Sequence, residues 1–313
     1  GAVLVVALVV VALAAPWLAP WEPGQQLDPV AGRYLPPGSV RVPVVFGDGR
    51  SLLADAVAWR GAELVIERLG RQERYPAAAL AEPTPGEPGR PRRFHLGTDR
   101  FGRDVLSRLL HGARVSLAIG VLAAALAIGL GTLVGAAAAT GGPWADGVLM
   151  RLVDAVLAVP RLFLLIALVA LLRPGMMALV LVLAATGWMS VSRLLRAEIQ
   201  ALQAREFVLA ARGLGQHPVR ILAVHLLPNA LTPVLVMAGL LVGQAILAES
   251  SLSFLGLGVP PPVPSWGEMV ASGADRLLGA WWVATFPGLA IVVTVIAFNL
   301  LTDGLRDLLD PHH

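Results

Sequence analysis

A few charged side chains stand inside otherwise apolar stretches of this sequence, where each needs a partner or a function to offset its cost. Arg161 follows Pro160 in the apolar run 150–172, and Glu249 ends the run 231–249. A guanidinium in such a place can line a water-filled path and meet the carboxylate of a solute, or it can bind a neighbouring helix. Because proline kinks a helix, Pro160 can act as a gating element. We therefore predict Pro160, Arg161 and Glu249 as candidate pore or gate residues.

A second pair of charges in the same run has a simpler interpretation. Arg151 and Asp154 stand at positions i and i+3, which share one face of a helix. We expect these two side chains to pair with each other near the inner membrane surface. Pro287 is a further candidate for a kink, in the run 281–302.

The residue patterns of common catalytic sites are missing from the sequence. A P-loop needs a lysine that reaches the nucleotide phosphates, and all 24 basic residues of this chain are arginines. The patterns H-E-x-x-H and G-x-S-x-G are absent, there is no cysteine, and the histidines are scattered. We therefore predict no catalytic, cofactor-binding or metal-ligating residues, so that any ATP would be hydrolysed by a partner.

The composition is that of a polytopic membrane protein. The chain has 313 residues, of which 56% are hydrophobic and 14% charged, and its mean hydropathy is +0.72. An ordinary soluble domain is about 25% charged. Arginine is spread along the chain and is not gathered into a basic domain, which argues against nucleic-acid binding.

A spanning helix needs roughly 20 mostly apolar residues, and lipid admits only helices or closed barrels. The apolar runs are continuous and lack the alternation of barrel strands, so we predict helices. We expect the start of the chain, at Gly1, to be trimmed, and we interpret residues 1–18 as a first span and not as a secretory signal, because further spans follow. The predicted spans are 1–18, 115–139, 150–172, 176–193, 231–249 and 281–302.

The proline-rich residues 19–97 separate this first span from a core at 98–313. The stretches "SVRVPVVF" and "LLADAVAWRGAELVIERL" are typical of strands, with a hairpin turn at Asp48-Gly49. We expect a small β-containing domain outside the bilayer, and an ordered but irregular loop is the alternative.

Residues 98–114 have an apolar face and a charged face, and Thr98 or Asp99 can cap a helix. They predict an amphipathic helix along the membrane surface, or else the first turns of the second span. The stretch "SSLSFLGLGVPPPVPSWG" predicts a rigid outer loop with Trp266 in the interfacial belt. This loop would line an outer gate, touch a partner or simply connect two spans.

Orientation follows from arginine in short loops, which favours the cytoplasmic side. A cytoplasmic N-terminus places 140–149, 194–230 and 303–313 inside, and puts Arg173 and Arg276 in outer loops. The inner loops then hold or border Arg151, Arg193, Arg196, Arg205, Arg212, Arg220 and Arg306. We therefore predict that both termini are cytoplasmic.

The segment "EFVLAARGLGQHPVRILAVHLLPNAL" (206–231) is basic and too polar to lie in lipid. Gly213 and Gly215 are typical helix stops, and Pro218 suits the first turn of a second helix that runs to about Leu227. Pro228 is expected to break the chain before the fifth span. A DNA-reading helix–turn–helix is the alternative, and its position between two spans argues against it.

The small residues of this segment would let another surface approach its backbone closely. These residues are Ala210, Ala211 and Gly213, and we expect Ala211 to lie at the surface.

Residues 209–228 resemble the signature E-A-A-x3-G-x9-I-x-L-P of the permease subunits of ABC importers. Leu209 stands in place of the glutamate and His225 in place of the isoleucine. The stretches 95–120, 249–269 and 299–311 resemble the dipeptide/oligopeptide permeases, and among them the C-type, second subunit. The residues that match the signature are Ala210, Ala211, Gly215, Leu227 and Pro228.

This resemblance implies an all-α membrane protein of six spans, with the type I ABC importer permease fold and a β insertion between the first two spans. It implies a second related permease, two cytoplasmic ATPases that use ATP and Mg, an extracytoplasmic binding protein and a bacterial inner membrane. Arg161 could then meet a peptide carboxylate. The loop at about 197–230 would couple to the ATPases through Leu209, Ala210, Ala211, Arg212, Gly213, Gly215, Leu227 and Pro228.

Other functions are compatible with parts of the sequence. The same architecture could import nickel or another small solute. A proton-coupled carrier would need several interior carboxylates and an inverted repeat. A membrane-anchored interaction protein could use the β insertion, but one span would suffice for it.

Overall fold

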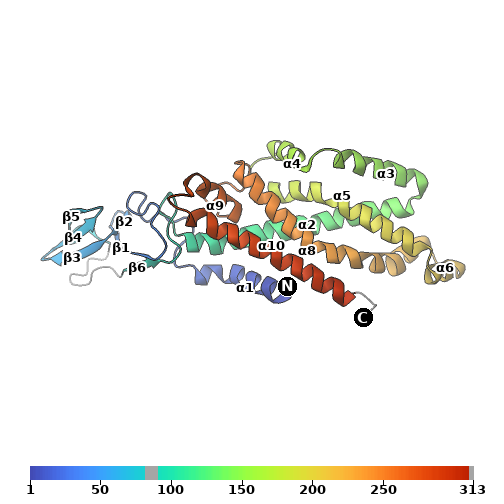
Figure 1. Ribbon diagram of the computed structural model, residues 1–313, viewed down its shortest axis with the longest axis horizontal. Coiled ribbons are helices and arrows are strands. Elements are labelled where there is room, and N and C mark those ends of the chain that lie inside the picture. The colour runs from blue at the N-terminus through green and yellow to red at the C-terminus, as the bar shows by residue number, and fades with distance from the viewer. Residues whose placement is uncertain (82–90, 310–313) are drawn as a thin grey trace. The chain divides into compact units, whose positions relative to one another are not determined.

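The computed structural model describes residues 1–81 and 91–309, which form two compact units (Figure 1). The first unit comprises Gly1–Val10, Val115–Pro260 and Ile291–His313. The second comprises Val11–Arg114 and Pro261–Ala290. The helices α1, α2 and α10 each contribute residues to both units.

Long helices make up the first unit, because its Leu-, Val- and Ala-rich runs favour unbroken backbone hydrogen bonding in lipid. Among the described residues, four helical stretches are long and apolar enough to cross a membrane: Val105–Thr140, Met176–Gln203, Pro218–Phe254 and Trp282–Leu308. The helix bounds are α1 Ala2–Leu18, α2 Val105–Thr140, α3 Gly142–Leu157, α4 Arg161–Ala170, α5 Met176–Gln203, α6 Glu206–Gly213, α7 Pro218–Arg220, η2 Ile221–Leu226, α8 Leu227–Phe254, α9 Trp266–Gly273, η3 Ala274–Arg276 and α10 Trp282–Leu309.

The two other predicted spans differ from simple long helices. The 17 residues of α1 are at the short end of the length that crosses a bilayer. The predicted span 150–172 is not a straight helix, because α3 and α4 are bent by 90° at a break that includes Pro160, where a kink was expected. Pro160 precedes α4 and cannot donate an N–H to the preceding turn, so the helix stops there.

Close helix packing in the first unit depends on two glycines of α2. A Cβ at Gly131 would lie 2.6 Å from the carbonyl oxygen of Trp188, and one at Gly135 would lie 2.6 Å from that of Ser192. Small residues at this spacing let the backbones of α2 and α5 touch, as in membrane helix pairs. An apolar core that includes Ile119, Leu165, Leu179, Leu183 and Leu252 joins α2, α4, α5 and α8.

The second unit contains two small antiparallel sheets, which confirms the predicted β insertion. The turn at Asp48-Gly49 joins the first two strands, and Gly49 has the positive φ of 83° that such a turn needs. The sheet orders are β2-β1-β6 and β3-β4-β5, with the strands β1 Ser39–Val45, β2 Ser51–Ala54, β3 Ala56–Arg60, β4 Glu63–Arg68, β5 Arg71–Pro76 and β6 Arg92–Phe94, and the turn η1 Ala77–Ala79. Both sheets contribute to one apolar core that includes Val44, Phe46, Ala54, Leu64 and Ile66.

Residues 98–104 form a loop, so the prediction of a separate amphipathic helix from Thr98 is wrong. Helix α2 begins at Val105 and continues into the span, as the alternative had it. The carboxylate of Asp104 accepts hydrogen bonds from the backbone N–H and hydroxyl of Ser107, both at 2.7 Å, and so caps the helix.

Buried charges hold this loop within the second unit. Asp99 accepts a bond from Arg103 Nε at 2.7 Å, and Arg108 Nη2 lies 2.6 Å from Glu268 Oε2 in α9. Trp266, predicted for the interfacial belt, is instead buried, and its indole N–H donates to Leu109 O at 3.0 Å. Trp266, at the end of the predicted loop, is thus packed against the start of α2, where its indole N–H finds an acceptor.

Asp28 ties the segment before the insertion to the strands. It is 1% exposed and accepts two bonds from Arg68 at 2.9 Å, and others from the N–H groups of Val30, Ala31 and Leu53. Burial by itself would raise the pKa of this carboxyl, but these hydrogen bonds outweigh burial and hold the pKa below 3.8, its ordinary value.

We predict that Asp28→Asn lowers the free energy of unfolding of the second unit by about 2–3 kcal/mol, because it leaves the Arg68 charge without its partner. Hydrogen exchange of the Val30, Ala31 and Leu53 amides should accelerate. Because the folded-state pKa is lowered, the contribution of Asp28 is present above pH 3.8 and is lost as the pH falls through the folded-state value.

The matched control is Asp48→Asn, which removes an ion pair whose side chains are 51% and 76% exposed and which should change little. Equal exchange rates in wild type and Asp28→Asn would contradict the role given to Asp28.

Candidate functional site

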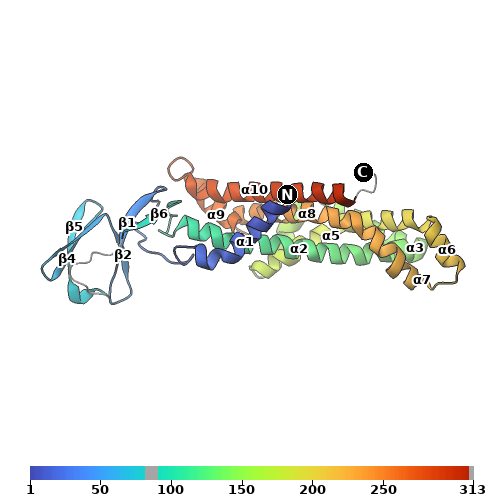
Figure 2. The same ribbon diagram turned by 90° about the horizontal axis from the view of Figure 1, so that it is seen from below.

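The segment between α5 and α8 forms a short helical excursion at one end of these two helices (Figure 2). Helix α5 ends at Gln203, and Arg205 has the extended conformation of a helix N-cap before α6. The sequence favours this break in direction only weakly, since residues 197–212 are strong helix formers. The excursion carries the predicted coupling residues from Leu209 to Gly215, whereas Leu227 and Pro228 form the first turn of α8.

The end of α6 is a glycine-terminated turn centred on Gly215. The Gly215 N–H donates to Arg212 O at 3.0 Å, and the Gln216 N–H donates to Ala211 O at 3.2 Å. These two bonds make a Schellman motif, whose left-handed residue is Gly215 at φ 74°. Gly213 lies within α6, so the prediction that both glycines stop the helix is wrong for Gly213.

One face of α6 is buried and the other is exposed, and the prediction that Ala211 lies at the surface is wrong. Val208 and Ala211 are buried, at 0% and 5% exposure, because positions i and i+3 share the inner face of the helix. Ala211 is therefore not a surface residue. The exposed face consists of Glu206, Phe207, Leu209, Ala210, Arg212, Gly213 and Leu214, and we call it the α6 outer face.

The chain continues from this excursion into α8 without the break that Pro228 was expected to cause. The residues 221–226 of η2 are π-helical, and the Leu227 N–H donates to Leu222 O, five residues back. A proline cannot donate to the preceding turn, and its ring crowds the carbonyl four residues earlier. The wider π turn accommodates both effects, so α7, η2 and α8 form one helical path from Pro218 to Phe254.

His225 connects this π-helical segment to the turn after α6, a link that we did not predict. His225 Nε2 lies 3.2 Å from Gln216 Oε1, and the imidazole is 6.5 Å from the ring of Phe207, centre to centre. Histidine stands where the signature has isoleucine, and this departure was the available signal. Only the fold brings Gln216 within reach of it.

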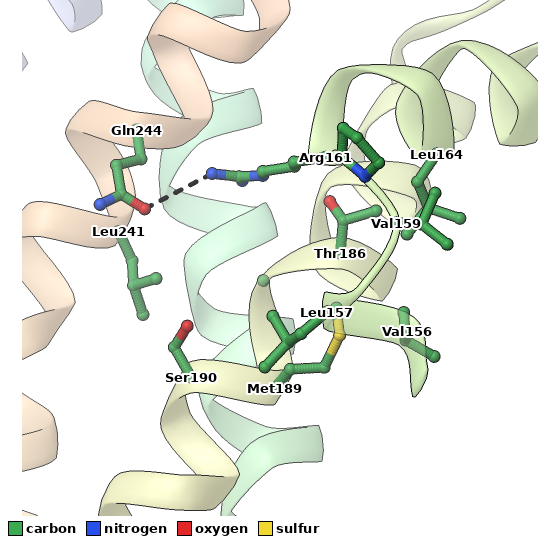
Figure 3. A pocket seen from close by; sticks show the side chains of 12 residues that line it. Val156, Leu157, Val159, Arg161, Leu164, Thr186, Met189, Ser190, Leu241 and Gln244 are labelled. Atoms are coloured by element: carbon green, nitrogen blue, oxygen red, sulfur yellow. Dashed lines mark hydrogen bonds between the residues drawn. The ribbon is translucent and has the colours of Figure 1, made fainter. Parts of the chain in front are cut away.

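Arg161 begins α4 and points into a cavity of about 180 Å³ in the first unit (Figure 3). Its Nη1 lies 3.5 Å from Gln244 Oε1 of α8, which is the outer limit of a hydrogen bond. Pro160, also predicted, lies at the rim because it forms the break before α4. The other lining residues are Val156, Leu157, Val159, Leu164, Thr186, Gly187, Met189, Ser190 and Leu241.

Glu249 and Asp154 lie elsewhere. Glu249 is fully buried and accepts a bond from Ser253 at 2.8 Å within α8, and it is not among the residues that line the cavity. Asp154 pairs with Arg193 of α5 at 2.5 Å, so the prediction that it pairs with Arg151 is wrong. The turn of α3 that carries Asp154 faces α5, where Arg196 also binds Asp146.

Comparison with known proteins places these features in a family context. The family model "Binding-protein-dependent transport system inner membrane component" matches residues 116–312, and "N-terminal TM domain of oligopeptide transport permease C" matches residues 1–37. The di/tripeptide transport system permease protein DppC of Pseudomonas aeruginosa is 46% identical over 219 residues, which cover 70% of this chain and 72% of the relative. The dipeptide transport system permease protein DppC of Alkalihalophilus pseudofirmus is 41% identical over 216 residues, 69% of this chain and 71% of the relative.

Solved structures share the fold at lower identity. The inward-facing MetNI methionine ABC transporter matches with a TM-score of 0.56 at 17% identity, over 65% of this chain and 97% of that chain. An amino acid ABC transporter crystallised with histidines matches with a TM-score of 0.52 at 16% identity, over 65% and 95%. These likenesses concern the fold and not the transported molecule.

The turn after α6 gives a test with an internal control. A Cβ at either Gly213 or Gly215 would meet no atom within 4 Å, and Gly215 alone of the two has a positive φ. We predict that Gly215→Ala destabilises the turn by about 1–2 kcal/mol, the cost of the left-handed conformation. Gly213→Ala should be neutral or stabilising by up to about 1 kcal/mol, since alanine favours a helix.

Hydrogen exchange over residues 206–220 of the full chain measures both effects. Faster exchange in Gly213→Ala than in Gly215→Ala would contradict the assignment of the turn.

Proposed function

Because this chain belongs to the family of binding-protein-dependent transport system inner membrane components, we propose that it is one of two permease subunits that form the path of an ATP-driven importer of dipeptides and oligopeptides. It has the type I ABC importer permease fold, with a β insertion between α1 and α2. The observation that carries the coupling role is the α6 outer face, which projects apolar side chains from a short helix between two spans. The proposal of peptides draws on the names of relatives at 41–46% identity.

ATP and Mg are bound by two separate ATPase subunits in this proposal, since the chain has no lysine to build a P-loop. The α6 outer face docks in a cleft of one ATPase. Phe207, Leu209 and Leu214 are 44%, 51% and 82% exposed, which supplies apolar contact area. Arg205 and Arg212 at its two ends supply positive charge. Leu209 replaces the signature glutamate and adds apolar contact area there, and the carboxylate that this face offers is that of Glu206.

The helical path from Pro218 to Phe254 gives the movement of the ATPases a route to the membrane interior. When the ATPases close, α6 is displaced, and the Schellman turn and the Gln216–His225 contact pass this displacement to η2. Helix α8 continues from η2 to Leu241 and Gln244, which line the cavity beside Arg161. A movement at α6 therefore changes the shape of that cavity.

Orientation and partners complete the proposal. The α6 outer face and both termini lie in the cytoplasm of a bacterial cell, and the β insertion lies outside its inner membrane. An extracytoplasmic binding protein delivers the substrate, and a second related permease supplies the other half of the path. No nucleic acid is involved.

We predict that Ala210→Glu separates ATP hydrolysis from transport, because a charged side chain on the α6 outer face obstructs docking while Ala210 itself is exposed. The complex of both permeases, both ATPases and the binding protein is reconstituted in liposomes, and ATP-dependent uptake of labelled dialanine is measured beside uptake of nickel. Wild type should take up dialanine, and Ala210→Glu should lose most of that uptake while the two permeases still co-purify.

Two variants control this experiment. Ala62→Glu, at an exposed turn of the β insertion, should transport normally. Ala211→Glu should instead reduce the yield of folded protein, because Ala211 is buried. Normal uptake in Ala210→Glu would remove α6 from the coupling mechanism, and ATP-dependent uptake of nickel without dialanine would favour the metal importer.

The orientation gives a separate prediction. The chain has no cysteine, so single cysteines report their location without background. Arg60→Cys in β3 should react with a membrane-impermeant thiol reagent in intact spheroplasts. Leu214→Cys, at a site 82% exposed, should react only after permeabilisation. The reverse pattern would place the α6 outer face outside the cell.

A further inference from the structure

The cavity beside Arg161 is lined by two membrane-spanning helices. Thr186 and Ser190 are near the middle of α5, and Leu241 and Gln244 are near the middle of α8. Arg161 enters from the α3–α4 break, where the backbone has left the helical path (Figure 3). A guanidinium between membrane-spanning helices is costly unless a counter-charge or water accompanies it.

The described part of the chain supplies no such counter-charge. Within residues 1–81 and 91–309, no carboxylate lies at ion-pair distance from Arg161, although other arginines of the same unit, Arg193 and Arg196, have aspartate partners. Its Nε is buried without a hydrogen-bond acceptor, and the contact with Gln244 is long. Because guanidinium has five N–H donors, most of its binding capacity is unused.

The remainder of the cavity limits what can approach this guanidinium. Leu157, Leu164, Met189 and Leu241 make most of its wall apolar. Thr186 and Ser190 add hydroxyl groups to this lining (Figure 3). Pockets for whole drug-sized ligands measure about 300–1,000 Å³, and this cavity of about 180 Å³ holds one end of a small molecule.

We propose that this cavity is a carboxylate-binding subsite on the translocation path, in which Arg161 receives the carboxylate of a passing peptide. The inference rests on the proposed function, since it assigns a site to the substrate of that importer. Guanidinium and carboxylate match in a two-pronged geometry, and the adjacent apolar wall receives a small side chain. The N-terminus of α4, which starts at Arg161, adds partial positive charge at the same place.

The test uses a single-cysteine reporter in the complete complex of permeases and ATPases, without binding protein. Ser190→Cys places a thiol at the cavity in a chain that has no other cysteine. The alkylation rate of this thiol is measured against rising concentrations of three probes. These are Ala-Ala, its C-terminal amide Ala-Ala-NH2, and Ala-Asp-NH2, whose only carboxylate is in the side chain.

We expect Ala-Ala to protect the thiol and Ala-Ala-NH2 to protect it far less. Protection by Ala-Asp-NH2 would identify the side-chain carboxylate as a second source, and its failure would restrict the site to the C-terminus. Arg161→Gln should raise the half-protecting concentration of Ala-Ala by roughly tenfold to a hundredfold, the loss expected for a charged hydrogen bond. Arg161→Lys should retain part of the protection, because it keeps the charge but loses the fork.

Three results would overturn the proposal: equal protection by acid and amide, unchanged protection in Arg161→Gln, or no protection by any probe. The proposal can also be tested without Arg161→Gln, because Ala-Ala can be compared with Ala-Ala-NH2 in the Ser190→Cys chain that keeps Arg161. This comparison tests the proposal even if Arg161→Gln fails to assemble. Loss of the second permease from Arg161→Gln, together with equal protection by acid and amide, would assign Arg161 to a subunit contact. Failure of the proposed function would be recognised by a different result, namely no ATP-dependent dialanine uptake by wild type. That result would also contradict the assignment of a peptide subsite.

Discussion

The helical unit depends on one constraint, that backbone N–H and C=O groups in hydrocarbon must bond within their own helix. Most of the chain meets it with long uninterrupted helices such as α2, α5 and α8. Two departures follow from prolines, which cannot donate. At Pro160 the chain bends by 90° and a cavity opens beside it. At Pro228 the chain stays helical by widening to a π turn. The same missing N–H donor therefore accompanies a cavity in one place and a continuous helical path in the other.

The helical path from Pro218 and the cavity share one element, because α8 contributes to both. Its extended helical path starts at Pro218, beside the α6 outer face, and passes Leu241 and Gln244 at the cavity. Helix α5 leads into α6 and also lines the cavity through Ser190, while Gly131 and Gly135 hold it against α2. The second unit is stabilised differently, by ion pairs of arginines with the buried Asp28 and Asp99 and with the partly buried Glu268. Arginine suits such pairs, since its planar fork satisfies two oxygens at once.

Individual residues show which features of the site the sequence pattern predicted and which it did not. Gly215 was predicted as a left-handed stop, and its φ of 74° confirms that conformation. Gly213 has the same residue type two positions earlier and is helical, because the Schellman bonds can close around only one of them. Ala210 and Ala211 are identical in sequence terms, yet one is exposed and the other buried, since the face of α6 that packs inward is set by neighbouring segments. Trp266 was assigned to the membrane interface from its type, and a hydrogen bond to Leu109 O places it in a core.

The sequence by itself determined the class of the protein and the approximate position of its spans. The reason is that a segment's hydropathy and length decide whether it can cross a bilayer, and both are local properties of the sequence. It also determined the β insertion, the absence of a lysine-bearing P-loop and the place of the loop that resembles a coupling segment. Tertiary structure alone decided the pairing of Asp154 with Arg193, the link between Gln216 and His225, and the gathering of Arg161, Ser190 and Gln244 around one cavity. Each of these depends on which helix faces lie opposite each other. Such facing is set by packing between segments far apart in the chain, and no periodicity within one segment encodes it.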